Sequence, residues 1–177
     1  MANADRRSAA RLAAVQALYQ MEVTGKGLKE TRAEFESFWI GNEIEGVQYR
    51  QAETAFFSDI LTGVVAAQGP IDRLIDKALA AGWPLARIDA VMRAILRAGA
   101  YELKERADVP ARVSIKEYVD IAGAFFGAEE AGMINAVLDA LARTVSVRVE
   151  QRGDGPVSHL SAAGAELQLV GEGRWGM

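Results

Sequence analysis

Residues 85–103, LARIDAVMRAILRAGAYEL, form the stretch that most constrains the fold. Apolar residues recur in it at steps of three and four, a spacing typical of one face of an amphipathic helix. These residues are Ile88, Val91, Met92, Ile95, Leu96, Gly99 and Leu103. Small residues at Ala94, Ala98 and Ala100 let other helices approach on further sides. We therefore predict that this helix lies at the centre of the molecule.

Charged residues occupy the remaining positions of this helix, at Arg87, Asp89, Arg93, Arg97 and Glu102. Asp89 stands four residues before Arg93, and Glu102 stands four residues before Arg106. Opposite charges at this spacing form weak ion pairs along an exposed helix face. The pattern predicts a solvated rim of charge on the central helix.

Apolar periodicity elsewhere predicts six further helices and no sheet, which places the chain in the all-α class. The expected ranges are 6–23, 31–40, 47–67, 70–81, 115–126 and 128–147. Glycine or proline marks most of the expected ends, at Gly25, Gly41, Gly69-Pro70, Gly82 and Gly127. These residues are typical of positions where a helix stops.

Short polar side chains support several of the predicted helix starts. Asp5 is the expected N-cap of the first helix. Thr31 with Glu34, and Ser114 with Glu117, have the spacing of a capping box, in which side chains accept hydrogen bonds from the N–H groups of the first turn. We expect helices to begin at both boxes.

The periodic pattern fades after Val147, and residues 148–177 are rich in glycine. We therefore predict a single helical domain over residues 1–147 and an irregular C-terminal extension over 148–177. Gly69-Pro70 is the expected boundary between two abutting helical subdomains of about 5–68 and 70–147.

The composition of the 177 residues limits the chemistry available to the chain. It has no cysteine, which excludes disulfides and thiolate nucleophiles, and its single histidine is His159 in the tail. No nucleophile with a neighbouring base and no phosphate-binding loop stands out, so we expect no catalytic residue, no cofactor and no metal. Without a membrane-spanning apolar run or a signal-peptide pattern, the expected location is the cytoplasm.

Three arginines, Arg6, Arg7 and Arg11, concentrate positive charge at the start of a chain whose net charge is −4. Arginine side chains bind phosphate and stack on bases. Positive charge near a helix N-terminus also opposes the helix dipole, so we expect some compensating reason for it. A solvated helix start and a small nucleic-acid-binding corner both remain open, and the second requires guanidinium groups that face solvent.

Phe125 and Phe126 precede Gly127 at the predicted end of a helix. Adjacent side chains on a helix point about 100° apart, so both rings are buried only where the helix end is covered on two sides. Core packing and a base-stacking platform remain open for these rings. For Asn135, a satisfied buried amide and a reader of a base edge remain open.

Four separated segments, in this order, resemble the NusB family of bacterial transcription antitermination factors. They are Arg6-Arg7 with Arg11 and residues 14–19, Arg93–Arg97 with residues 101–103, Val109-Pro110 with Ile115 and Glu117, and residues 126–129 with 135–139. The resemblance covers about residues 5–146. It implies a seven-helix, all-α fold of two abutting helical subdomains.

The resemblance also implies a function and a set of binding residues. Proteins of this family bind the boxA element of ribosomal RNA transcripts as single-stranded RNA, together with the small-subunit ribosomal protein NusE, and help RNA polymerase read through terminators. On matching positions it assigns RNA contacts to Arg6, Arg7, Arg11, Gln16, Tyr19, Phe126, Glu130 and Asn135. We expect that replacing Arg7 and Arg11 weakens RNA binding and leaves stability nearly unchanged.

Two departures from the family pattern affect the expected affinity. Ser8 and Ala9 interrupt the arginine cluster, and Glu130 stands where an Asp is familiar. We therefore expect weak RNA binding without the protein partner.

Two other functions remain open on the sequence. The chain is similar to the non-catalytic RNA-binding module of ribosomal RNA methyltransferases, and it also suits a structural homodimer that buries the alanine face of its first helix. Since NusB-like proteins occur as monomers and as dimers, the resemblance leaves the oligomeric state open.

Overall fold

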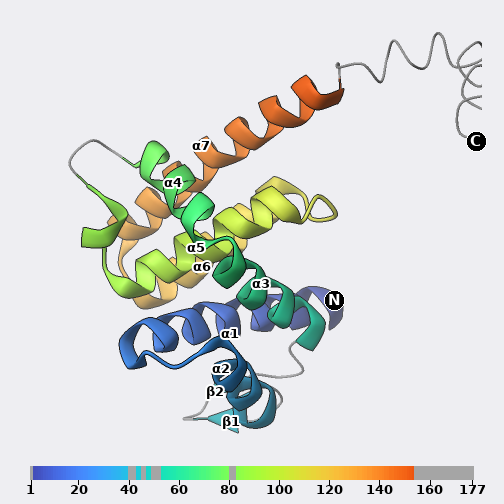
Figure 1. Ribbon diagram of the computed structural model, residues 1–177, viewed down its shortest axis with the longest axis vertical. Helices are drawn as coiled ribbons and strands as arrows, with labels where there is room; N and C mark the ends of the chain where they lie inside the picture. The colour runs from blue at the N-terminus through green and yellow to red at the C-terminus, as the bar shows by residue number, and fades with distance from the viewer. Residues whose placement is uncertain (1, 40–42, 45–46, 49–52, 80–82, 154–177) are drawn as a thin grey trace, which may run out of the picture. The chain divides into compact units, whose positions relative to one another are not determined.

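The computed structural model describes residues 2–39, 43–44, 47–48, 53–79 and 83–153 (Figure 1). This part of the chain contains seven α-helices, as expected. They are α1 (Ala2–Thr24), α2 (Leu28–Glu34), α3 (Thr54–Ala66), α4 (Gln68–Ala78), α5 (Ala90–Glu105), α6 (Ala111–Phe125) and α7 (Ala128–Gly153). Two compact units are distinguished, Met1–Ala142 and Arg143–Met177, and the packing described below lies within the first.

Three short elements accompany the α-helices. A π-helical turn, η1 (Phe35–Trp39), follows α2, and a 3-10 turn, η2 (Leu85–Arg87), precedes α5. Two-residue strands β1 (Glu43–Ile44) and β2 (Val47–Gln48) pair antiparallel, with Glu43 opposite Gln48 and Ile44 opposite Val47. The all-α class is confirmed, while the expectation of no sheet is wrong by this one short pair.

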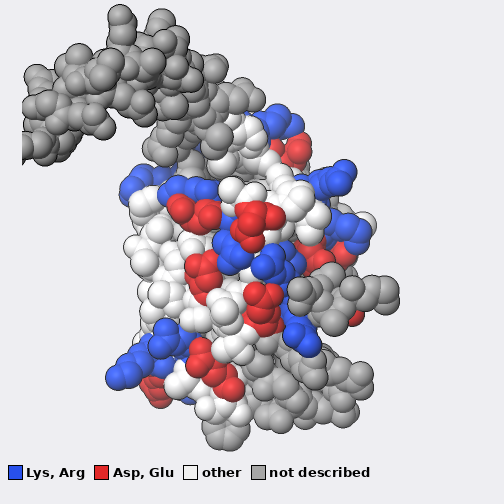
Figure 2. Space-filling model, turned by 90° about the vertical axis from the view of Figure 1, so that its right-hand side faces the viewer, with Lys and Arg blue, Asp and Glu red and all other residues white. Residues whose placement is uncertain are grey.

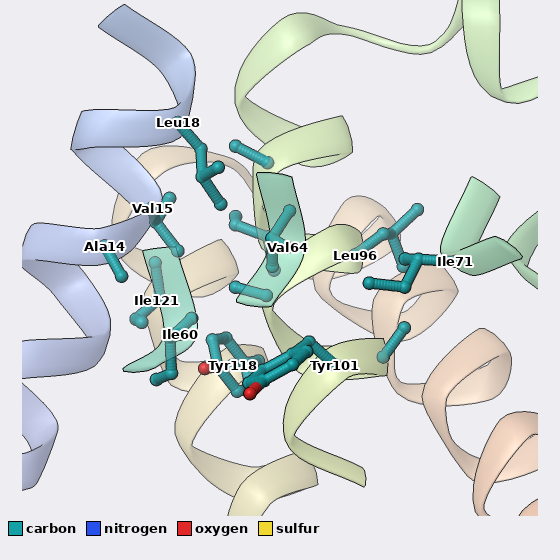
Figure 3. Packing of buried hydrophobic residues seen from close by; sticks show 14 of the residues in the cluster. Ala14, Val15, Leu18, Ile60, Val64, Ile71, Leu96, Tyr101, Tyr118 and Ile121 are labelled. Atoms are coloured by element: carbon teal, nitrogen blue, oxygen red, sulfur yellow. The ribbon is translucent and has the colours of Figure 1, made fainter. Parts of the chain in front are cut away.

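Helix α5 is the central helix, as its apolar spacing predicted. It packs against α1, α3, α4 and α6. Ile95, Leu96, Ala98 and Gly99 are buried on it, and Figure 3 shows Leu96 beside Ile71 of α4 among the core side chains. A Cβ atom added at Gly99 would lie 2.9 Å from Leu138, so the lack of a side chain there permits close packing.

The expected solvated rim holds only at Arg87 and Asp89, which are exposed and precede α5. Asp89 caps the helix by accepting hydrogen bonds from the backbone N–H groups of Val91 and Met92, at 2.8 and 3.4 Å. Arg93 pairs with Glu22 of α1, and Glu102 is fully buried. Both expected pairs, Asp89–Arg93 and Glu102–Arg106, are therefore wrong, because Arg93 and Glu102 take their partners from α1.

Several expected helix starts are also wrong. Asp5 lies in the first turn of α1, since this helix begins at Ala2. Thr31 and Ser114 are buried within α2 and α6, whose N-caps are Gly27 and Pro110. Both capping boxes fail because the helices begin a turn earlier than the box spacing indicates. Pro110 suits this position because a helix N-terminus does not need its missing N–H group.

The third predicted helix, 47–67, is shorter than expected, because α3 runs over Thr54–Ala66 and Val47 belongs to β2. Helix α4 begins at Gln68 with Pro70 in its first turn. The expected stops at Gly41 and Gly82 lie outside the described residues. The division into subdomains 5–68 and 70–147 stays a prediction.

The start of α7 at Ala128 agrees with the expected start. Its expected buried stripe is confirmed at Ile134, Val137, Leu138 and Leu141, each at most 4% exposed. The helix continues to Gly153, six residues past the expected end of periodicity at Val147. The remainder of the predicted extension, 154–177, lies outside the described residues.

We predict that Gly63→Ala destabilises the protein by about 1–3 kcal/mol, the usual cost of overpacking a core. A Cβ atom at Gly63 would overlap the ring of Tyr101, and the Tyr101 hydroxyl is held by a 2.9 Å hydrogen bond to Asp59. Gly123→Ala in α6 is the matched control, because no atom lies within 4 Å of the added Cβ. Urea unfolding should show a loss only for Gly63→Ala, and equal stability of the two variants would contradict this packing.

Candidate functional site

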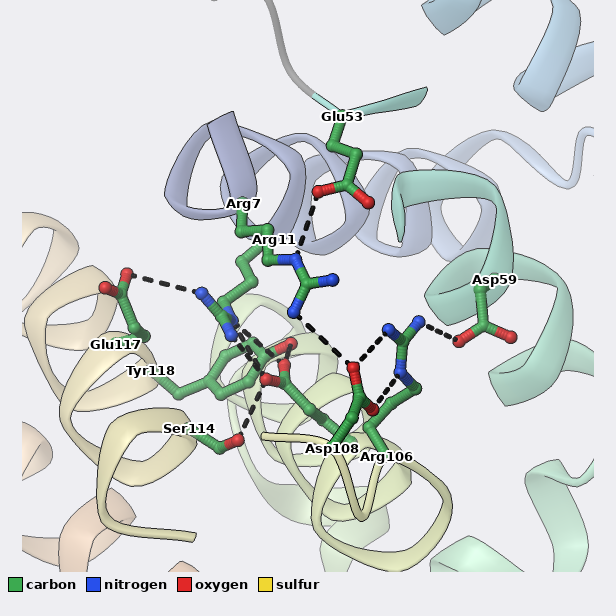
Figure 4. A network of polar contacts seen from close by, with 10 residues as sticks. Arg7, Arg11, Glu53, Asp59, Arg106, Asp108, Ser114, Glu117 and Tyr118 are labelled. Atoms are coloured by element: carbon green, nitrogen blue, oxygen red, sulfur yellow. Dashed lines mark hydrogen bonds and ion pairs between the residues drawn. The ribbon is translucent and has the colours of Figure 1, made fainter. Parts of the chain in front are cut away.

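Arg11 of α1 forms a buried ion pair with Glu102 of α5 (Figure 4). The Arg11 side chain is 3% exposed and that of Glu102 is 0% exposed. Arg11 Nη2 lies 2.5 Å from Glu102 Oε1, and Arg11 Nε lies 3.0 Å from Oε2. The two nitrogens therefore bind both oxygens of one carboxylate, the bidentate geometry that makes such pairs strong.

Two hydroxyl groups of α6 complete the environment of Glu102. Ser114 Oγ and Tyr118 Oη each donate a hydrogen bond of 2.8 Å to the carboxylate. Burial, followed by the nearby charge of Glu102, raises the pKa of Tyr118 well above its ordinary value, which keeps the phenol protonated as a donor. Burial lowers the pKa of Arg11, but the hydrogen bond to Glu102 and the charges of Glu102, Tyr118 and Glu117 together outweigh burial, so the net pKa is raised.

A more exposed layer of ion pairs lies next to this buried pair. Arg7 Nε lies 3.0 Å from Glu53 Oε2, and Arg7 Nη1 lies 3.6 Å from Asp108 Oδ2. Arg106 binds Asp108 at 2.8 Å and Asp59 at 3.1 Å. The hydrogen bond from Arg106 lowers the pKa of Asp108 to about 2. Each cation of this layer thus has a carboxylate partner.

The ring of Phe56 lies beneath these guanidinium groups. The Cζ atoms of Arg7, Arg11 and Arg106 are 4.7, 5.0 and 4.7 Å from its centroid. At this distance the face of an aromatic ring attracts a cation. The buried Phe56 therefore holds three cations close together while carboxylates offset their mutual repulsion.

The expected cationic corner is wrong at Arg11, whose guanidinium is enclosed and fully paired. The Arg7 side chain is 31% exposed and paired with carboxylates, whereas Arg6 is exposed. The face drawn in Figure 2 shows acidic and basic side chains interspersed, with no broad patch of one sign. Among the three expected arginines, Arg6 is the one whose exposure fits the prediction.

Gln16 and Tyr19, two more expected RNA contacts, line a groove of about 480 Å³ beside α1. The full lining is Val15, Gln16, Tyr19, Gln20, Val23, Thr24, Phe35, Val91 and Phe125. None of these residues carries a charge. Gln16 is rotated by about 140° around α1 from Arg11, so the groove and the ion-pair cluster use different sides of one helix.

The other expected residues lie apart from this groove. Glu130 lines a second hollow with Trp83 and Met92, and Asn135 is exposed in a third with Arg112. Phe126 is partly buried against the hydrophobic core. The structure thus brings together Gln16 and Tyr19 but does not join all eight predicted residues in one site.

The family resemblance assigns no RNA contact to Phe125, although its sequence position left a base-stacking role open. Its ring is 46% exposed and lines the groove with Tyr19. The signal was present, because two adjacent aromatic residues at a helix end cannot face one direction. Which of the two faces outward depends on where α6 ends, which the sequence did not determine.

None of the helices in the described ranges is long and apolar enough to cross a membrane. Within the same ranges, no group of three or more Asp, Glu or His side chains is placed to hold a metal ion. Fold and site define an all-α protein whose first helix contributes to a buried ionic cluster on one side and an open uncharged groove on another.

Comparison with known proteins identifies the family. The sequence profile of the NusB family matches residues 8–143. A protein from Rhodopseudomonas palustris strain TIE-1, called Transcription antitermination protein NusB, is 67% identical over 140 residues, which cover 79% of this chain and 80% of that protein. A protein of the same name from Nitrobacter hamburgensis is 63% identical over 140 residues, covering 79% of this chain and 88% of that one. The chain belongs to the NusB family.

Solved structures share the fold. NusB of T. maritima superposes with a TM-score of 0.65 at 27% identity, covering 77% of this chain and 90% of that one. A chain from a crystal structure of NusB and NusE in complex with double-stranded RNA gives a TM-score of 0.64 at 23% identity, covering 78% of this chain and 97% of that one. The helical arrangement described above is therefore the NusB fold.

We predict that Arg11→Ala lowers the free energy of unfolding by about 3–5 kcal/mol, because it leaves the buried Glu102 carboxylate without its cation. Arg7→Ala is the matched control on the same helix, and its partly exposed pairs account for less than about 1 kcal/mol. Urea unfolding measures both changes. If both variants lost only a small and similar amount of stability, Arg11 would not be a structural residue. That result would agree with the expectation from the sequence that replacing Arg7 and Arg11 leaves stability nearly unchanged.

We also predict an alkaline loss of stability that depends on Tyr101. Burial, followed by its hydrogen bond to Asp59, raises the pKa of Tyr101 to about 12 from an ordinary 10.0. The folded state therefore keeps the proton longer than the unfolded state, so this contribution is complete below pH 10 and declines as the pH rises from about 10 to 12. Between pH 9 and 11, Tyr101→Phe should lose about 1 kcal/mol less than wild type in urea unfolding. Parallel pH profiles would contradict the assignment.

Proposed function

We propose that this protein is a transcription antitermination factor that binds boxA-type RNA of ribosomal RNA transcripts together with NusE and promotes read-through by RNA polymerase. The observation that carries the proposal is the 67% identity, over 140 residues, to a protein called Transcription antitermination protein NusB. Identity at this level over four fifths of the relative supports a shared activity. The antitermination role is one of binding, so we assign no catalytic residue and place the protein in the cytoplasm with the transcription machinery.

The geometry favours a smaller set of RNA contacts than the family resemblance implied. We propose that Arg6, Gln16 and Tyr19 of α1 contact RNA directly, and that Arg7 contributes when a phosphate replaces one of its carboxylate partners. Arg11 acts as a positioning residue. Its buried pair with Glu102 fixes the rotation of α1 about its axis, and so the direction in which Gln16 and Tyr19 point. Phe126, Glu130 and Asn135 stay predictions for the region around the start of α7.

This arrangement predicts a weak electrostatic contribution to RNA binding. Each phosphate neutralised on a single strand adds about 0.7 to the slope of log affinity against log salt. Arg6 is exposed, and Arg7 is already paired with Glu53 and Asp108. These two arginines therefore neutralise only one or two phosphates. A second protein on the same RNA raises the effective concentration of each component and supplies the missing affinity.

We predict that boxA RNA binds this protein weakly alone and at least tenfold more tightly with NusE present. The salt slope of the protein alone should be about −0.7 to −1.4, as expected for one or two phosphates. Fluorescence anisotropy at several salt concentrations measures both, with an RNA of scrambled boxA sequence as the control.

Failure of boxA RNA to bind in the presence of NusE, or equal binding of the scrambled RNA, would contradict the proposal. Size-exclusion chromatography with and without boxA RNA tests the structural alternative. A dimer whose elution does not change when RNA is added favours that alternative.

A further inference from the structure

Two aromatic rings stand half-exposed at the groove of α1. Tyr19 is 39% exposed and Phe125, at the end of α6, is 46% exposed. Both line the same groove of about 480 Å³, a volume in the range of small-molecule sites. We propose that this groove holds one unstacked base of the bound RNA against these rings, and that Phe125 is a base-stacking residue. The inference rests on the proposed RNA-binding function and names a residue that the family pattern did not supply.

The outward direction of Phe125 follows from how α6 ends. Phe126 is extended, with φ −131° and ψ −175°, and its N–H donates the last helical hydrogen bond to the Ala122 carbonyl at 2.8 Å. The chain therefore leaves the helix between the two aromatic residues. Phe126 packs against the core, and Phe125 remains at the rim of the groove.

The chemistry of the lining suits a base better than a phosphate. No lining residue is charged, so nothing in the groove compensates a phosphate, whereas every base presents an uncharged π-face. Gln16 and Gln20 are among the lining residues, and a side-chain amide can both donate to and accept from a base edge. Gln20 Nε2 is already held by Glu34 at 3.2 Å, which orients that amide.

Buried residues form a well-packed floor of the groove. Val15 is fully buried, and Phe35 is 1% exposed with its ring stacked on Phe57 at a centroid distance of 5.9 Å. A preformed apolar surface binds a planar ring without first paying the entropy of ordering it.

A base is also a better match for the groove than a second protein copy. The large exposed apolar side chains of the groove are Tyr19, Val23 and Phe125. A stable protein interface buries about 800 Å² on each partner, far more than three side chains provide. Stacking on aromatic rings also supplies the affinity that the paired arginines do not.

The test uses boxA RNA carrying 2-aminopurine at one position at a time, with NusE present. Because stacking quenches this base, we expect one position at which binding of wild-type protein quenches its fluorescence strongly. Phe125→Ser should remove this quenching and weaken RNA binding about 5- to 150-fold, the range expected for loss of one stacked base. Val113→Ser is the matched control, because Val113 is also on α6 and is 39% exposed but does not line the groove.

Thermal unfolding of both variants first establishes that they fold. Unchanged quenching and affinity in Phe125→Ser would overturn the base site, while the proposed function would stand because wild type still binds boxA RNA. A dimer in light scattering that Phe125→Ser converts to a monomer, without an effect on RNA affinity, would assign the groove to contact between copies and overturn the base site. No RNA binding by wild type with NusE would overturn the proposed function together with this inference.

Discussion

Arg11 and Glu102 bring opposite charges into the interior of Met1–Ala142, where neither charge is tolerated alone. A buried ion costs several kcal/mol to remove from water, so the pair is stable only if its remaining polar atoms are also satisfied. Ser114 and Tyr118 provide two further donors, and α1, α5 and α6 are thereby connected through one carboxylate. This requirement fixes the rotation of α1 about its axis. The rotation in turn decides which residues of α1 face solvent, and these include Gln16 and Tyr19 at the groove.

The same cluster explains why positive charge is tolerated near the N-terminus of α1. Because α1 begins at Ala2, Arg7 and Arg11 lie beyond its first turn, where the helix dipole has little effect, and carboxylates of other segments compensate for the mutual repulsion of these arginines. Glu53 and Asp108 pair with Arg7, as Glu102 does with Arg11, so the local positive charge is largely neutralised within the protein. An RNA phosphate that approaches Arg7 must compete with these carboxylates. Specificity for a strand therefore cannot come from charge density at this corner and has to come from groups that recognise bases.

Repeated apolar spacing made the helices and much of the core predictable from the sequence, most clearly at α5 and at the start of α7. Such spacing is a property of one segment and needs no knowledge of its neighbours. The ion pairs were not predictable in this way, since Arg11 and Glu102 are 91 residues apart and Arg93 and Glu22 are 71 apart. The capping boxes at Thr31 and Ser114 failed for a related reason: both residues are buried within their helices, and the Ser114 hydroxyl donates to Glu102 instead of capping the start of a helix. Within the candidate site, Gln16 and Tyr19 line one groove, whereas Arg11 is buried on another side of α1, and the RNA contacts of Gln16 and Tyr19 stay predictions.

The two sides of α1 therefore have different roles, one structural and one open to solvent, whereas the sequence predicted a single RNA-binding surface. Buried arginine chemistry stabilises the junction of three helices, and the solvent-facing side offers amides and an aromatic ring in an uncharged groove. An RNA-binding surface of this composition gains little from long-range attraction, because stacking and hydrogen bonds act only at contact. Its association with RNA should therefore be slow and weak unless another molecule brings the strand close. A partner bound to the same transcript meets that need, which gives a physical reason for an antitermination factor of this family to act within an assembly.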